Sequence, residues 1–364
     1  MRGRHLLKVL HYVNEGNLAW VQPWMQLLDA LRTKGICNVV MCPEYGTLAS
    51  IAREHNFEVR TCKAPFPWAP ALCLEVGKTV KSVKPDLIHT RLSSAAALGG
   101  YWGYKLGIPV VATLDKYPKT KYYTHVTHLV GCSRAVSKHM IDQGIPEKKV
   151  STIHNPVLFE RYIRNEEKRL ELREKAGIEE GQIVVLGAGR FVKWKAFDVL
   201  IKAAAKIESS KNWVLWLVGD GSERKHLERL VEEYCLQDRT TFWGFASDVG
   251  PHLWASDIFV QPSGGPEGFS LMLLEAMASG LPAIATNIGG TLDILEEGSN
   301  GWFVKPGDVD GLCRVLSFAL DQADLTEVGL RASQSAARFR VEPIACQHED
   351  LYRFLVQNKT ELGK

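Results

Sequence analysis

Short apolar runs alternate with amphipathic segments along the first half of the chain. The runs at 6–12, 38–42 and 109–114 have the length and apolar content of buried strands. The segments 23–34 and 48–55 carry apolar residues at helical spacing. Strands that alternate with helices predict a parallel sheet with helices on both faces, which is an α/β fold.

The alternation is interrupted once and then restarts. Residues 165–175 form a charge-rich segment with few apolar positions, and a new buried strand is expected at 182–188. We therefore predict two Rossmann-like domains, 1–170 and 171–343, with a C-terminal helix at 344–364 that packs back on the first domain. A length of 364 residues agrees with two domains of ordinary size. Further strands are expected at 213–218, 240–243, 258–261 and 282–286, and further helices at 199–206, 224–234 and 271–279.

The composition is that of a globular protein, with 46% hydrophobic and 23% charged residues. No apolar run approaches the ~20 residues that a membrane-spanning helix needs. The start of the chain is basic and then apolar, and we interpret it as a first strand rather than a secretory signal. Eight scattered cysteines include no Cys-x-x-Cys pair, which argues against a metal or redox centre and favours a cytoplasmic location.

Charge is distributed unevenly between the two halves. Residues 1–169 hold 24 basic and 13 acidic residues, and the remainder holds 20 basic and 28 acidic ones. A basic first half predicts contact with something anionic, such as a membrane surface, a phosphorylated glycan or nucleic acid.

Two cations follow the first strand of the second half. The segment Gly187-Ala-Gly-Arg190 is followed five residues later by Lys195. Two cations at a glycine-rich strand end can neutralise a diphosphate. A dinucleotide fingerprint is excluded because Val192 stands where its third glycine would be. Solvated surface cations are the alternative.

Two carboxylates accompany a second glycine-rich loop. Glu267 lies in the loop 262–270, and Glu275 lies one turn inside the apolar helix that follows. A carboxylate among apolar neighbours must be paired or hydrogen-bonded, and a ligand with several hydroxyls supplies such bonds. A neighbouring cation is the alternative partner.

These residues resemble the retaining glycosyltransferases of family 4, which have the GT-B fold. Glu267 and Glu275 match the E-x7-E element of that family, and Gly189-Arg190 with Lys195 resembles its diphosphate-binding segment. The match over 183–320 is specific, whereas the first half matches more loosely. The resemblance implies two Rossmann-like domains that face a central cleft, and sugar transfer from a nucleotide-sugar donor.

The resemblance also implies a role for each matching residue. Arg190 and Lys195 would bind the donor diphosphate, Glu267 the sugar hydroxyls and Glu275 the ribose. The remaining donor contacts would come from Gly16, Gly219, Gly244, Phe245, Gly268, Phe269, Ser270 and Leu271.

Three positions depart from the family pattern. The first loop holds a single glycine, Gly16, instead of a glycine-rich pair, and Ala196 replaces a glycine. Asp115 stands where many members have a histidine that contacts the donor sugar. Asp115 is therefore a candidate catalytic residue beside Glu267, Arg190 and Lys195, unless its loop is built differently.

No metal and no other cofactor is expected. Asp308-Val-Asp310 matches a D-x-D metal motif, but its Pro-Gly-Asp context before a helix is typical of a turn and an N-cap. Arg190, Lys195 and helix dipoles can stabilise a departing diphosphate instead.

The predicted function is transfer from a nucleotide sugar, with a UDP-sugar favoured, to an anionic or lipid-linked surface glycan such as lipopolysaccharide or capsule. A peripheral membrane contact is expected, with Phe66 and Trp68 as an interfacial anchor or as a covered loop. No nucleic-acid-binding motif is present. Two alternatives are a GT-B nucleotide-sugar epimerase, which would use His89, Asp115 and Glu267, and a non-catalytic glycan or membrane binder.

Overall fold

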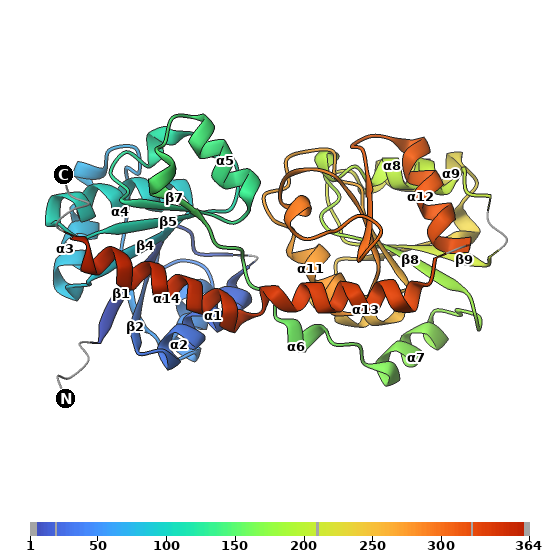
Figure 1. Ribbon diagram of the computed structural model, residues 1–364, viewed down its shortest axis with the longest axis horizontal. Helices are drawn as coiled ribbons and strands as arrows, with labels where there is room; N and C mark the ends of the chain where they lie inside the picture. The colour runs from blue at the N-terminus through green and yellow to red at the C-terminus, as the bar shows by residue number, and fades with distance from the viewer. Residues whose placement is uncertain (1–5, 19, 209–210, 322, 360–364) are drawn as a thin grey trace. The chain divides into compact units, whose positions relative to one another are not determined.

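The computed structural model describes residues 6–18, 20–208, 211–321 and 323–359. The chain forms two compact units, one of Met1–Pro156 with Val341–Lys364 and one of Val157–Arg340. Each unit has a parallel sheet with helices packed against it (Figure 1). The predicted pair of Rossmann-like parallel-sheet domains is thereby confirmed.

The sheet of the first unit has seven parallel strands in the order β3-β2-β1-β4-β5-β6-β7. Its central strands are buried on both faces, which explains their continuous apolar runs. The strands are β1 Leu7–Val13, β2 Ile36–Cys42, β3 Glu58–Thr61, β4 Leu87–Arg91, β5 Val110–Leu114, β6 His128–Gly131 and β7 Val150–Thr152.

The helices of the first unit include the C-terminal one. In Figure 1, α14, drawn in red, runs beside α1, and the two helices pack against each other. Ile344, Ala345, Tyr352 and Leu355 of α14 are part of the same core as β1, β2 and α1. The helices are α1 Val21–Thr33, α2 Leu48–Glu54, α3 Leu74–Val83, α4 Ser93–Leu106, α5 Arg134–Asp142 and α14 Val341–Gln357.

The sheet of the second unit has six parallel strands in the order β10-β9-β8-β11-β12-β13. The strands are β8 Ile183–Ala188, β9 Trp213–Val218, β10 Thr240–Gly244, β11 Ile258–Gln261, β12 Ala283–Thr286 and β13 Gly301–Val304. The helices are α6 Phe159–Tyr162, α7 Glu166–Lys175, α8 Phe197–Ala204, α9 Arg224–Glu233, α10 Gly250–Ala255, α11 Leu271–Ala278, α12 Val309–Asp321 and α13 Leu325–Ala336.

The division between the units differs from the predicted boundary at 170. It falls between Pro156 and Val157, and the chain returns to the first unit at Val341. The reason is that α6 and α7 pack against helices of the second unit. No side chain of α7 is buried, so its sequence gave no sign of this packing. The predicted helix 344–364 begins earlier, at Val341, and its residues 360–364 lie outside the described part.

Both sheets reverse their strand order at one place. The reversal lies between β1 and β4 in the first unit and between β8 and β11 in the second. Loops that follow the two strands at such a point diverge to opposite sides and leave a crevice, where open parallel sheets bind ligands. The two crevices locate the regions in which candidate residues should gather.

No helix in the described ranges is long and apolar enough to cross a membrane.

A cluster of buried histidines lies where α14 packs on the first sheet, with His348 of α14 among them. His89 contacts Tyr352 Oη at 2.5 Å and Thr113 Oγ1 at 2.7 Å through its two ring nitrogens, and His11 Nε2 contacts Asn38 Oδ1 at 2.9 Å. Burial lowers the pKa of His11 to about 4 and the pKa of His348 to about 3. The folded first unit therefore holds these imidazoles neutral.

We expect the first unit to lose stability in mild acid. The unfolded chain protonates histidine near the ordinary value of 6.5, whereas the folded unit does not, so the unfolded state binds more protons as the pH falls below 6.5. Each such histidine should cost about 2 kcal/mol of unfolding free energy between pH 7 and pH 5. Urea unfolding across this range measures the loss. His348→Gln removes one titrating group and should make the dependence shallower; an unchanged slope in this variant would contradict the assignment.

Candidate functional site

The candidate residues of the second unit gather at the carboxyl edge of its sheet. Arg190 follows β8, Gly219 follows β9, Phe245 follows β10, and Glu267 lies in the loop after β11. Because the strands are parallel, all of these positions lie at one edge. The switch point between β8 and β11 lies within this group.

An ion pair joins the two loops that flank the switch point. Lys195 Nζ donates a hydrogen bond to Glu267 Oε2 at 2.7 Å, and both side chains are largely buried. Ser263 Oγ donates to the same carboxylate oxygen at 3.3 Å. The backbone N–H groups of Gly264 and Gly265 both donate to Trp194 O, at 2.8 and 3.1 Å. Two residues separated along the sequence are thereby held together at the crevice.

Arg190 presents its charge at the same edge. The residue is exposed, and no carboxylate among the described residues pairs with its guanidinium. The preceding glycine packs against the next strand: a Cβ on Gly219 would lie 1.9 Å from Gly189 O, and Gly219 has φ +141°. Glycine is required there because the two strand ends touch through their backbones.

The Glu267 loop rests on the loop after β12. Gly290 N donates to Glu267 O at 3.0 Å, and a Cβ on Gly290 would lie 2.2 Å from Gly268 O. Phe269 is buried with its ring 5.5 Å from that of Phe339. The backbone of the Glu267 loop is therefore held on one side by Gly290 and on another by an aromatic contact.

The same loop leads into α11 through a capped turn. Ser270 Oγ accepts from Leu273 N at 3.3 Å and donates to Gln261 Oε1. Leu271 is the first residue of the helix. The start of a helix carries a partial positive charge and amide donors without intrahelical partners, so this end of α11 can bind an anion.

Glu275 lies deeper in α11, where its side chain is half-buried among apolar neighbours. Its carboxyl group is hydrogen-bonded to Tyr162 of α6, and burial raises the pKa of Glu275 to about 7. The tyrosine bond acts in the opposite direction and lowers this pKa. Burial also raises the pKa of Tyr162, so the phenol stays a donor. With a pKa of about 7, Glu275 is present in both its protonated and its ionised form near neutral pH.

The end of β10 offers a flat aromatic surface. Phe245 is 78% exposed, and Gly244 has φ +73°, a left-handed conformation that favours glycine. Trp243 packs edge-on against Trp216 at 5.0 Å and supports the turn from below.

Ala196 occupies a strained position directly after Lys195. Its φ is +52°, in the left-handed region, which costs a residue with a Cβ roughly 1–2 kcal/mol. The position where the family has glycine thus has the left-handed backbone conformation that glycine adopts most readily.

In the first unit, Gly16 lies at the sheet reversal, after β1. A Cβ on Gly16 would lie 2.0 Å from Tyr45 O, and Gly16 O accepts from Leu48 N at 2.9 Å. This glycine is needed for the contact between two loops, whatever else it binds.

Asp115 is engaged by a charge network of the first unit. Its Oδ1 accepts from Arg91 Nη2 at 2.5 Å and from Asn155 Nδ2 at 3.0 Å. The Arg91 guanidinium also lies 4.2 Å from the centre of the Trp20 ring. Arg91 ends β4, and Asp115 and Asn155 follow β5 and β7, so three strand ends converge on one carboxylate. Asp115 therefore has structural partners in its own unit, as in the alternative that its loop is built differently from that of the family.

Sequence reasoning missed Tyr162, Arg91 and Asn155. Tyr162 lies in a four-residue helix with no periodic signal, and its partner Glu275 is remote in the sequence. Arg91 ends a strand at the reversal point, and this position was a usable sign.

The two aspartates of the D-x-D match have partners in the protein. Asp308 Oδ1 accepts from Gly311 N at 2.8 Å at the start of α12, and Asp310 pairs with Lys206 at 2.8 Å.

Two family models match the chain. "Glycosyl transferases group 1" matches residues 168–335, and "Glycosyltransferase Family 4" matches residues 24–161.

Known proteins agree with these matches. The chain is 32% identical over 209 residues to N-acetyl-alpha-D-glucosaminyl L-malate synthase of Bacillus anthracis, covering 57% of this chain and 54% of that protein. It is 30% identical over 246 residues to the lipopolysaccharide core biosynthesis glycosyltransferase LpsE of Rhizobium meliloti, covering 67% of this chain and 68% of that protein. The chain thus spans about half the length of the first relative.

A solved structure shows the same fold. HepE of Anabaena in complex with UDP superposes with a TM-score of 0.84 at 22% identity, covering 96% of this chain and 100% of that one.

Glu275 should titrate near pH 7, and Tyr162→Phe should shift its pKa upward, because the variant removes the hydrogen bond that favours the carboxylate. Carboxyl ¹³C NMR of glutamate-labelled protein measures the titration, and Glu275→Gln identifies the resonance. Tyr234→Phe, at an exposed position of the same unit, is the matched control. An ordinary carboxyl titration near pH 4.5, or no response to Tyr162→Phe, would refute the buried pair.

Proposed function

Since the chain belongs to glycosyltransferase family 4 and has the GT-B fold, we propose that it transfers a sugar from a nucleotide-sugar donor, a UDP-sugar above all, to an anionic or lipid-linked surface glycan. Lipopolysaccharide and capsule are acceptors of this class. The observation that carries the proposal is the Lys195–Glu267 pair at the sheet switch point, beside the exposed cation of Arg190.

Donor binding would use both kinds of charge at this edge. Arg190 and Lys195 supply charge-assisted donors for the diphosphate, helped by the start of α11. Glu267, already oriented by Lys195 and Ser263, accepts from sugar hydroxyls. Glu275 accepts from the ribose hydroxyls, which can replace the bond from Tyr162.

The base would lie against the remaining part of the same edge. The exposed ring of Phe245 offers a stacking surface, and Gly244, where a Cβ would meet nothing within 4 Å, leaves room for close approach to the backbone. HepE, which shares the fold, was solved with UDP, and this supports UDP-sugars as the first donors to test.

The reaction would retain the anomeric configuration. A double displacement needs a free carboxylate as nucleophile on the far face of the sugar. Asp115 is held by Arg91 and Asn155, and Glu267 by Lys195. We therefore infer attack on the leaving-group side through an oxocarbenium-like state, in which the diphosphate takes the acceptor proton and Arg190 and Lys195 stabilise the developing charge.

The same two cations make a metal ion unnecessary in this scheme. Asp308 and Asp310, the residues of the D-x-D match, are occupied by a helix cap and an ion pair with Lys206. The proposal is accordingly a metal-independent enzyme.

The acceptor side is argued from the charge and exposure of the first unit. Its residues, Met1–Pro156 and Val341–Lys364, include 23 basic and 14 acidic ones. Phe66, Trp68, Leu72 and Leu74 are all exposed, with Trp68 at 79%, so the covered-loop interpretation is wrong. Exposed aromatic and aliphatic side chains in a basic unit suit an anionic membrane surface. LpsE, a lipopolysaccharide core enzyme by name, supports an acceptor of this kind. The reaction would then occur at the cytoplasmic face of a membrane.

The epimerase alternative loses one of its residues. His89 is buried between Tyr352 and Thr113 in the core of the first unit, so it has no free ring nitrogen for a sugar.

Arg190→Ala and Lys195→Ala should each lower UDP affinity and transfer about 10- to 100-fold, because each removes a charge-assisted hydrogen bond. Lys193→Ala, an exposed lysine in the same turn, is the matched control and should behave as wild type. Calorimetry with UDP measures binding, and UDP release from UDP-glucose, UDP-galactose and UDP-N-acetylglucosamine with truncated lipopolysaccharide measures transfer. Unchanged UDP affinity in both variants would end the donor-site assignment.

The same assay tests the mechanism. Activity should persist in excess EDTA, the product should retain the donor configuration by NMR, and Asp115→Asn should leave substantial activity. An inverted product, or activity that chelation removes and Mg²⁺ restores, would overturn the corresponding part of the proposal.

The protein should bind vesicles that contain anionic lipid, and binding should weaken as salt is added. Trp68→Ser should reduce binding because it removes a large exposed aromatic anchor. Phe354→Ser, at an exposed aromatic of α14 in the same unit, is the control and should leave binding unchanged. Co-sedimentation measures both variants. Equal binding by Trp68→Ser and wild type would exclude this loop as the membrane contact.

A further inference from the structure

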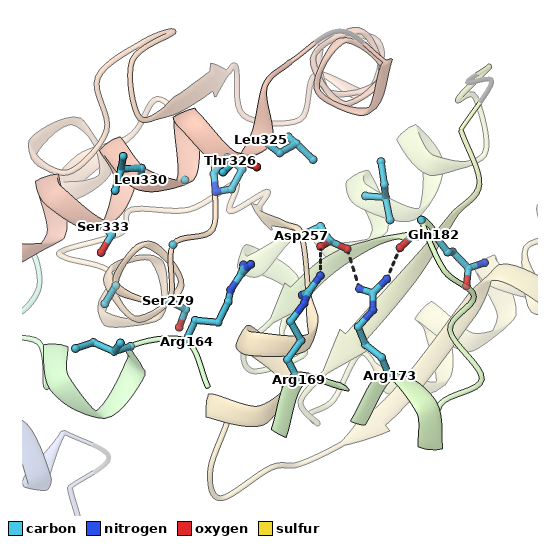
Figure 2. Close-up of a pocket in the computed structure, with 17 residues that line it drawn as sticks. Arg164, Arg169, Arg173, Gln182, Asp257, Ser279, Leu325, Thr326, Leu330 and Ser333 are labelled. Atoms are coloured by element: carbon cyan, nitrogen blue, oxygen red, sulfur yellow. Dashed lines mark hydrogen bonds and ion pairs between the residues drawn. The ribbon is translucent and has the colours of Figure 1, made fainter. Parts of the chain in front are cut away.

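The amino edge of the second sheet holds a cavity of about 610 Å³. It lies among the residues that precede β8, β11 and β12, the segment 163–173, and α13. Figure 2 shows Arg164, Arg169 and Arg173 on one side and Leu325, Thr326, Leu330 and Ser333 of α13 on the other. Three guanidinium groups in one cavity need an explanation, since like charges repel.

Two of the arginines are engaged by acceptors of the protein itself. Arg169 Nη2 bonds Asp257 Oδ1 at 2.7 Å, and its Nη1 bonds Trp254 O and Ser256 O at 2.7 and 3.0 Å. Arg173 Nη1 bonds Asp257 Oδ2 at 3.0 Å and Ala255 O at 2.9 Å. These bonds attach α7 to the start of β11.

The carboxylate of Asp257 has little left to offer a third cation. Its Oδ1 is taken by Arg169, and its Oδ2 is shared by Arg173 and Val184 N, the latter at 2.8 Å. It is also the one carboxylate among the cavity-lining residues that the structure describes. The lining therefore carries three positive charges and one negative charge.

Arg164 is the arginine without a partner. No hydrogen bond or ion pair joins its side chain to another described residue. In Figure 2 its guanidinium extends into the space between α13 and the Arg169–Asp257 pair, and no dashed line reaches it. Burial, and then the charge of Arg169, lowers the pKa of Arg164. A half-buried guanidinium that faces two others is unfavourable until an anion joins it.

We propose that this cavity binds the phosphoryl group of a small molecule, with Arg164 as its principal ligand. A phosphoryl dianion matches the net charge of the lining, and the planar guanidinium fits two of its oxygens. Thr326 and Ser333 supply hydroxyl donors from α13. The cavity is much larger than one phosphate, and Leu325 and Leu330 provide an apolar wall for the rest of the molecule.

This site is distinct from the donor site. Gln182 and Asp257 of the cavity precede β8 and β11, whereas Arg190 and Glu267 follow the same strands. β8 has six residues, so the two edges are separated by roughly 20 Å. The proposal goes beyond the proposed function and does not rest on it.

The test is calorimetric titration of the full chain with inorganic phosphate at constant ionic strength. Binding should persist in Arg190→Ala, which removes a donor-site cation, and should weaken about tenfold or more in Arg164→Gln. Arg314→Gln, an exposed arginine of the same unit outside the cavity, is the matched control for the lost charge. Arg164→Lys keeps the charge without the planar fork and should give intermediate affinity. Circular dichroism shows whether the variants are folded.

Two results would overturn the proposal. One is equal phosphate affinity in wild type and Arg164→Gln; the other is loss of all phosphate binding in Arg190→Ala. The source of the phosphoryl group is separated by repeating the titration with glucose 6-phosphate in the Arg190→Ala background. If glucose 6-phosphate binds more tightly than phosphate, and Leu330→Ser removes the difference, the ligand is a phosphorylated metabolite. Equal affinities of the two compounds support free phosphate as the ligand.

Discussion

At the carboxyl edge of the second sheet, successive loops touch through their backbones, and the candidate donor site depends on these contacts. Gly219 lies against Gly189, Gly290 against Gly268, and the amides of Gly264 and Gly265 bond one carbonyl of Trp194. A Cβ at Gly219 or Gly290 would collide with a backbone oxygen of the facing loop, so any larger residue at either position would push the loops apart. With the loops in contact, Lys195 and Glu267 meet at 2.7 Å, although different strands carry them.

Charge is arranged differently at the two edges of this sheet. At the carboxyl edge, one cation is paired and one is exposed, so the diphosphate of a donor would find one ligand oriented and another free. At the amino edge, Arg169 and Arg173 are hydrogen-bonded to Asp257 and to carbonyl groups. Among the arginines that line the cavity, only Arg164 has no partner in the described residues. Arginine thus has two uses in this segment: Arg169 and Arg173 attach α7 to the rest of the unit, and Arg164 remains available to an anion.

The parallel strands could be predicted because burial on both faces leaves a continuous apolar run, and the expected strands 213–218 and 258–261 coincide with β9 and β11. The short edge strand β3 alternates between exposed and half-buried residues and was not predicted. In the site, contiguous motifs placed Lys195, Glu267 and Glu275 correctly on their loops and helix. Contacts across space had no such signal: nothing local to Tyr162 indicates its remote carboxylate, and the position of Arg91 at the strand reversal does not identify Asp115 as its partner. The domain boundary was misplaced for the same reason, since α7 is attached by arginine side chains rather than by an apolar face.

The position of α14 at the end of the described chain also constrains the order in which the two units can fold during synthesis. The core of the first unit includes Ile344, Tyr352 and Leu355, which leave the ribosome after every residue of the second unit. The second unit is one continuous segment, Val157–Arg340, and its core is fully synthesised earlier. The first unit begins to be translated earlier, but its core stays incomplete, with the α14 side of its sheet open, until α14 has left the ribosome. A ribosome that stalls near residue 340 would hold a complete second unit and an unfinished first one.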